Sequence, residues 1–177
     1  MNHVMVDLET LGQTPGCAIL SIGAVAFDPY TSELGPEFYE VVNTRSCFDA
    51  GLKQDESTVN WWKTQKAEAA AVLDEARESK VLLAEALSRF RSYLQKFGLR
   101  DIRVWGNGSD FDNAILACCY KSINQNLPWR FYNNRCFRTL KNIRSVVEPV
   151  RQGTYHNALD DAKHQARHAL ALMETLR

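Results

Sequence analysis

The sequence predicts an α/β fold with a mixed five-stranded sheet that is flanked by helices. Up to residue 43, three strand-like apolar runs follow one another with short turns between them, which is typical of antiparallel neighbours. Beyond that point helical and strand patterns alternate, which is typical of parallel strands joined by crossover helices. A sheet that contains both kinds of neighbour is therefore expected, rather than a fully parallel one.

The strands are recognised by runs of apolar, β-branched and aromatic residues that end at turn residues. The turn DPYTSELG separates the second strand from the third, and DIRVWG reads as a short fourth strand. WRFYNN leads into a fifth strand or extended segment. The expected strands are residues 3–9, 18–28, 37–43, 101–106 and a segment from about 129 to 134.

Helices are expected where apolar residues recur at a spacing of three or four. Ser57 and Ser79 are candidate N-caps, because a serine hydroxyl can accept a hydrogen bond from the first free amides of a helix. Gly98 and Pro149 are candidate stops. The first expected helix begins at Ser57. The other expected helices are residues 67–77, Ser79 to Phe97, 109–123, 137–147, and Ala158 to the C-terminus.

Composition places the chain among soluble globular proteins. At 177 residues it suits one sizeable core, and we expect a single domain over residues 1–177. No apolar run approaches the roughly 18 residues of a membrane span, and the N-terminus lacks the pattern of a secretory signal. The five cysteines show no CxxC spacing, which favours reduced thiols in a cytoplasmic protein.

Acidic residues at three separate places carry the functional signal. Asp7 and Glu9 end the first strand in MVDLETLG, and strand alternation points both to one face of the sheet. Two adjacent anions repel each other, so a cation is expected between them. Asp112 follows in WGNGSDFDN, and HNALDDA supplies His156 and Asp161.

Three motifs occur in the order that characterises a known family: Asp7-x-Glu9, Asp112 within SDFDN, and His156-x-Ala158-x-x-Asp161. Each motif alone is weak, but the ordered set resembles the DEDDh 3′–5′ exonucleases, the DnaQ-like group with an RNase H-like fold. Two further segments, TVNWWKTQ and RCFRTL, resemble the phage and prophage branch of that group and its bacterial exoribonuclease relatives. The second motif departs from the proofreading members, which place the asparagine closer to the FD pair.

The resemblance implies hydrolysis of phosphodiester bonds at the 3′ end of single-stranded DNA or RNA, with release of nucleoside 5′-monophosphates. Two Mg²⁺ or Mn²⁺ ions would be held by carboxylate oxygens, which these hard cations prefer. Asp7 would bridge both ions, Glu9 and Asp161 would complete the site of the ion that holds the attacking water, and Asp112 would hold the other. His156 would be the general base, since a free imidazole has a pKa of about 6.5.

The same resemblance suggests a set of substrate-binding residues: Thr10, Leu11, Trp61, Asn107 and Arg138. Leu11 would wedge against the terminal base, and Arg138 would either contact phosphate or cover its helix. Of the two adjacent tryptophans, one is expected to face the core and the other the substrate groove.

The partner implied by the resemblance is a single-stranded nucleic-acid 3′ end, and the distribution of charge and aromatic residues also suits a nucleic acid. The net charge is zero, but residues 129–151 are rich in Arg and Lys with Glu148 as their only acid. Aromatic residues are interleaved, which suits a phosphate backbone with stackable bases. The alternative is a solvated helix face beside a core strand. No membrane partner is expected, and a homodimer stays open.

Two acidic pairs need to be told apart. If Asn157 caps the last helix, Asp160 falls at its third position, where a carboxylate favours the helix dipole. Asp161, five residues after His156, then matches the ligand position. Asp110 is likewise expected to be a helix-terminal acid, with Asp112 as the ligand.

His164 and His168 are four residues apart on the last helix, as in some zinc sites. They lack an HExxH arrangement and a third ligand, so we expect surface histidines.

Three rival functions stay open beside the exonuclease. They are a catalytically silent nucleic-acid-binding module on the same fold, an RNase H-type endonuclease, and a nucleotide phosphohydrolase. The full set of acidic residues argues against the silent module. His156, five residues before Asp161, favours an exonuclease over an endonuclease.

Overall fold

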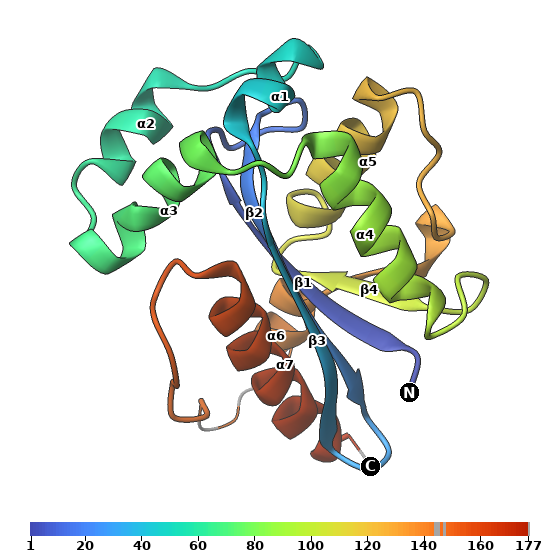
Figure 1. Ribbon diagram of the computed structural model, residues 1–177. Helices are drawn as coiled ribbons and strands as arrows, with labels where there is room; N and C mark the ends of the chain where they lie inside the picture. The colour runs from blue at the N-terminus through green and yellow to red at the C-terminus, as the bar shows by residue number, and fades with distance from the viewer. Residues whose placement is uncertain (144–145, 147, 177) are drawn as a thin grey trace.

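The computed structural model describes residues 1–143, 146 and 148–176. Five strands form one sheet in the order β3-β2-β1-β4-β5 (Figure 1). β1 pairs antiparallel with β2, and β2 with β3, whereas β4 runs parallel to β1 and to β5. The predicted mixed five-stranded sheet is thus confirmed. The strands are β1 His3–Thr10, β2 Ile19–Asp28, β3 Glu33–Val41, β4 Arg103–Gly106 and β5 Asn134–Cys136.

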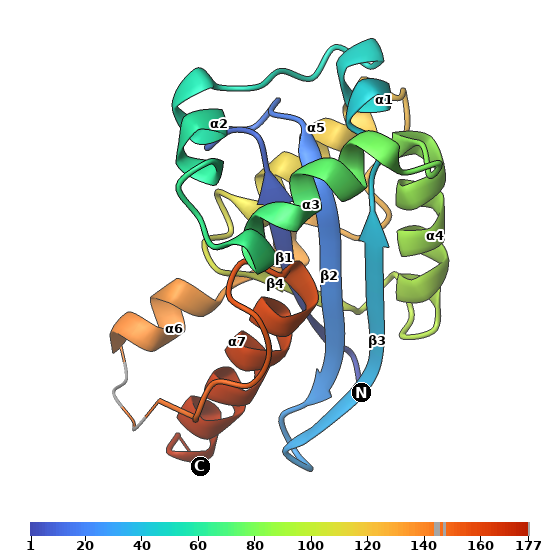
Figure 2. The same ribbon diagram turned by 60° about the vertical axis from the view of Figure 1, so that its left-hand side comes forward.

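Helices cover both faces of the sheet. Helix α7 lies across β1, β2 and β3 on one face, whereas α3, α4 and α5 pack on the other (Figures 1 and 2). The helices are α1 Thr44–Asp49, α2 Glu56–Trp62, α3 Ala67–Glu78, α4 Leu83–Gln95, α5 Asp112–Ser122, α6 Phe137–Ile143 and α7 Ala158–Glu174, with a 3₁₀ turn η1 at Phe131–Asn133.

The alternation of side chains along β1 decides where the acidic pair lies. Val4, Val6 and Leu8 belong to the apolar cluster under α3–α5, whereas Met5 belongs to the cluster under α7. Because successive strand side chains point to opposite faces, Asp7 shares the α7 face with Met5. Helix α7 therefore brings its own polar residues to the acidic end of β1.

Gly23 of β2 lets α7 approach the sheet closely. It is the strand partner of Asp7, and a Cβ atom there would lie 2.1 Å from the carbonyl carbon of Ala158. The first turn of α7 thus rests directly on the backbone of β2. A side chain at this position would push Asp161, one turn further along, away from β1.

Several boundaries differ from those expected. β3 begins at Glu33 rather than at residue 37, and the short helix α1 was not predicted. Ser79 does not cap α4, which begins at Leu83. Its hydroxyl instead donates to the carbonyl of Val41 and accepts from the amide of Val81, so it ties the end of β3 to the segment before α4.

The other two expected helix limits also shift. Ser57 lies inside α2, whose N-cap position is Asp55. The helix expected over 137–147 is observed as α6 up to Ile143, and residues 144, 145 and 147 of that expectation lie outside the described part of the chain. Within the described residues, none of the helices is both long and apolar enough to cross a bilayer.

Candidate active site

A cavity of about 370 Å³ opens at the C-terminal end of β1. Its lining comes from distant parts of the chain: the β1 end, helix α2, the turn after β4, and the start of α7. The residues that line it are Asp7, Leu8, Glu9, Thr10, Gly12, Gln13, Thr58, Trp61, Trp62, Asn107, Phe111, His156, Asp161 and Gln165.

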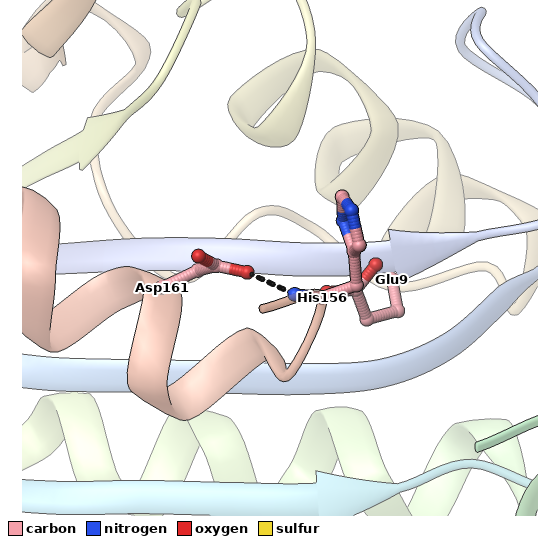
Figure 3. Close-up of side chains that lie close together, drawn as sticks. All are labelled: Glu9, His156 and Asp161. Carbon is pink, nitrogen blue, oxygen red and sulfur yellow. Dashed lines mark hydrogen bonds between the residues drawn. The ribbon is translucent and has the colours of Figure 1, made fainter. Parts of the chain in front are cut away.

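Glu9, His156 and Asp161 form the tightest group in this cavity. Their potential metal-binding atoms all lie within 4.8 Å of one another. Figure 3 shows the three side chains, with the backbone amide of His156 donating to Asp161 Oδ2 at 3.0 Å. Glu9 of β1, Asp161 of α7 and His156, two positions before the start of α7, thereby lie close together.

Asp7 lies beside this group and is held by α7. Gln165 Nε2 donates to Asp7 Oδ1 at 2.7 Å. Burial raises the pKa of Asp7 well above its ordinary value, and the charges of Asp112, Glu9 and Asp161 raise it further. The Asp7 carboxylate therefore ionises at a cost unless a cation compensates the charge.

Two other carboxyl groups are perturbed in the same direction. Burial, followed by repulsion from Asp161 and Asp112, raises the pKa of Glu9 to about 8. Burial raises the pKa of Asp112 to about 7, although backbone amides including that of Asn107, 2.9 Å from Oδ2, counteract it. These carboxylate oxygens are the donors that a hard divalent cation prefers, and bound cations would relieve their repulsion. The residues therefore fit Mg²⁺ or Mn²⁺.

The His156 ring is placed by the two tryptophans. It meets Trp61 edge-on at 5.0 Å between ring centroids and Trp62 at 6.2 Å. Trp62 is buried and donates from Nε1 to the carbonyl of Thr10, whereas Trp61 is 42% exposed. Both tryptophans line the cavity, but Trp62 is buried in the core whereas Trp61 is exposed.

Asp160 and Asp161 have separate positions. Asn157 accepts hydrogen bonds from the amides of Leu159 and Asp160, which confirms it as the N-cap of α7. Asp160 Oδ2 accepts from the amide of Thr154 at 2.8 Å and so holds the loop before His156. Asp161 instead lines the cavity.

The expected substrate-binding residues are only partly brought together. Thr10, Trp61 and Asn107 line the cavity, and Arg138 Nη2 donates to the carbonyl of Asn107 at 2.6 Å. Leu11 is not in this lining: it is 4% exposed and belongs to the main apolar cluster.

Comparison with known proteins assigns the chain to a family. Residues 2–173 match the family described as "3'-5' exoribonuclease Rv2179c-like domain". The chain belongs to this family. The resemblance to 3′–5′ exonucleases, predicted from three motifs, is thereby confirmed.

Relatives of this exoribonuclease-like domain agree with that assignment. An exodeoxyribonuclease of Enterobacteria phage T4 is 26% identical over 212 residues, covering 97% of this chain and 92% of the relative. The solved nuclease domain of 3'hExo, a DEDDh family member bound to rAMP, has a TM-score of 0.65 at 14% identity, over 98% of this chain and 92% of that one. E. coli exonuclease I in complex with a dT13 oligonucleotide has a TM-score of 0.63 at 15% identity, over 98% and 40%. These likenesses confirm the RNase H-like fold.

The role of Gln165 and the burial of His164 and His168 in this exoribonuclease-like domain were not predicted from its sequence. Gln165 binds Asp7, and its position four residues after Asp161 on the same helix face could have identified it. The expectation of surface histidines was wrong: His164 and His168 are 9% and 3% exposed. His164 Nε2 lies 2.9 Å from Glu148, and the His168 ring packs against Phe137 of α6. Helix α6 contacts both α7 and β4, so it covers the part of α7 that carries these histidines.

Proposed function

We propose that this chain is a metal-dependent 3′–5′ exonuclease, a single domain over residues 1–177. It would hydrolyse phosphodiester bonds at the 3′ end of single-stranded DNA or RNA and release nucleoside 5′-monophosphates. The observation that carries the proposal is the convergence of Asp7, Glu9, Asp161 and His156 on one cavity, in a chain of an exonuclease family.

The metal assignment rests on the charge of the cluster. Asp7 would bridge two Mg²⁺ or Mn²⁺ ions, Glu9 and Asp161 would hold one of them, and Asp112 the other. Bound divalent ions of this kind activate a water molecule and offset the charge on the phosphoryl and leaving oxygens. The raised pKa values of Asp7, Glu9 and Asp112, due first to burial, support the assignment, because ionising these carboxyl groups has a cost that a bound cation would offset.

His156 is proposed as the general base, which takes the proton of the attacking water on a ring nitrogen. Its backbone is fixed by Asp161 and its ring by the edges of Trp61 and Trp62. A base held in this way keeps one orientation toward the carboxylate cluster, and proton transfer requires such positioning.

The size and lining of the cavity support a single-stranded end as substrate. At about 370 Å³ the cavity is near the lower limit of small-ligand pockets, which suits one nucleotide rather than a duplex. Trp61 offers an exposed aromatic surface beside His156 on which a base can stack. Thr10 and Asn107 add polar groups to the lining, and Arg138 adds a cation next to Asn107.

Digestion of matched DNA and RNA oligonucleotides, labelled at either end, tests the proposal. With Mg²⁺ or Mn²⁺, a 3′ label should be released at once as mononucleotide, whereas a 5′ label should give a ladder that shortens with time. Chelator should stop both reactions. Cleavage of a circular single strand would instead indicate an endonuclease, turnover of free nucleotides alone a phosphohydrolase, and binding without cleavage a silent module.

A further inference from the structure

Arg151 lies against the carboxylate cluster from the loop that precedes α7. Its Nη2 atom is 2.5 Å from Asp161 Oδ1, and the two side chains are 14% and 17% exposed. The same Nη2 donates to the carbonyl of Thr154 at 2.9 Å, and the guanidinium lies 3.9 Å above the ring of Tyr155. Arg151 is thus built into the site rather than extended into solvent.

This ion pair uses a proposed metal ligand. One oxygen of Asp161 accepts from the backbone of His156 and the other is paired with Arg151. The positive charge of Arg151 also counteracts the rise in the pKa of Glu9. In the metal-free protein, Arg151 therefore supplies part of the charge that a divalent ion would supply.

The contacts of Arg151 also leave it displaceable. Its Nε atom is buried and has no hydrogen-bond partner. A buried donor without a partner has lost its hydration with no compensation, so the ion pair is less stable than its short distance indicates. A divalent ion at Asp161 carries twice the charge and has Glu9 as a second ligand within reach.

We propose that Arg151 is an internal counter-cation of Asp161 that competes with the divalent ion for this carboxylate. Metal binding then releases Arg151 from Asp161, while the hydrogen bond from the His156 amide to Oδ2 keeps the base in place. The inference rests on the proposed metal-dependent function. It differs from a supporting role for Arg151, in which removal of the arginine would weaken metal binding instead of strengthening it.

Calorimetric titration with Mn²⁺, without nucleic acid, tests the competition. Arg151→Gln should bind Mn²⁺ about tenfold more tightly than the wild type, since an opposite charge at this range changes the proton affinity of a carboxylate by about one to three pKa units. Arg151→Lys, which keeps the charge, should stay near the wild type. In chelator, Arg151→Gln should melt at a lower temperature, because Asp161 has lost its cation.

Arg138→Gln is the matched control for a general field effect. Arg138 also acts on Asp112 by its charge but is hydrogen-bonded to the carbonyl of Asn107 rather than to a carboxylate. Its removal should tighten Mn²⁺ binding less than Arg151→Gln does. Equal tightening in both variants, or unchanged or weaker binding in Arg151→Gln, overturns the competition. If the wild type itself binds no Mn²⁺, the proposed metal-dependent function fails as well.

Discussion

At the scale of single residues, neighbours in sequence have separate tasks. Asp160 and Asp161 are adjacent, yet one fixes the loop through Thr154 and the other lines the cavity. Trp61 and Trp62 both line the cavity, but only Trp61 is exposed whereas Trp62 is buried. Substitutions at such pairs separate structural from chemical roles, because each pair provides its own control.

Asp161→Asn should abolish most nuclease activity, whereas Asp160→Asn should leave most of it. Loss of a residue that only supports a metal ligand typically costs about 10–100-fold, so loss of a ligand should cost at least that. Asp160→Asn keeps an oxygen for the amide of Thr154 and should cost about 0.3–1 kcal/mol of stability through the helix dipole. Turnover and urea unfolding of both variants check this. Equal losses of turnover in two folded proteins would contradict the assignment.

His156→Ala should lower turnover by roughly 10²–10⁴-fold, the usual range for loss of a positioned general base. Mn²⁺ affinity should change little, because four carboxylates remain. Single-turnover kinetics and metal titration on the same preparation separate the two effects. Near-normal turnover of the alanine variant would show that the imidazole is not the base.

At the scale of elements, the site depends on how α7 meets the sheet. α7 supplies Asp161 and Gln165, and its first turn rests on Gly23 of β2. Glu9 of β1 and Asp161 of α7 lie more than 140 positions apart in the sequence. Their geometry is therefore set by helix-to-sheet packing rather than by local sequence.

Gly23→Ala should weaken both folding and metal binding. The new methyl group would lie 2.1–2.3 Å from backbone atoms of Ala158 and Leu159, so α7 must shift away from β2. We expect a loss of about 1–3 kcal/mol, typical of overpacking. Gly98→Ala is the control: Gly98 has φ +80° but open space around its Cα. It should lose about 1–2 kcal/mol from backbone strain alone and bind Mn²⁺ normally. Normal Mn²⁺ affinity in Gly23→Ala would contradict this account.

At the scale of the whole molecule, the sheet and its helices enclose a group of acids at one end of β1. The pKa of Glu9 is raised to about 8 and that of Asp112 to about 7, mainly by burial. The folded, metal-free protein therefore binds more protons than the unfolded chain at pH values between the ordinary carboxyl range and about 8. Folding and metal binding are thereby linked to pH.

In chelator, the free energy of unfolding should fall as pH rises from about 5 to about 8, because the unfolded chain has already released these protons. A loss of about 1 kcal/mol would lower the Tm by about 2–4 °C. Asp7→Asn should reduce the slope and raise the metal-free Tm, since it removes one of the repelling carboxylates. Thermal melts at both pH values check this. A steeper slope in Asp7→Asn would contradict it.

Much of the site could be predicted from the sequence, because strand alternation and helix spacing are local rules. They place Asp7 and Glu9 on one face, and the cap Asn157 distinguishes Asp160 from Asp161. The roles of Gly23, Arg151 and the buried His164 depend on which elements pack together. The position of Leu11 also depends on packing and not on a local rule: it follows β1 directly, and its side chain is buried in the core.

The order of the acidic residues along the chain has a consequence during synthesis. Asp7 and Glu9 are translated early, whereas His156 and Asp161 are translated more than a hundred residues later. A nascent chain that has already formed β1 to β3 still lacks His156 and Asp161. The carboxylates of β1 and α7 therefore come together at one site only after the last helix has been made and has packed on the sheet.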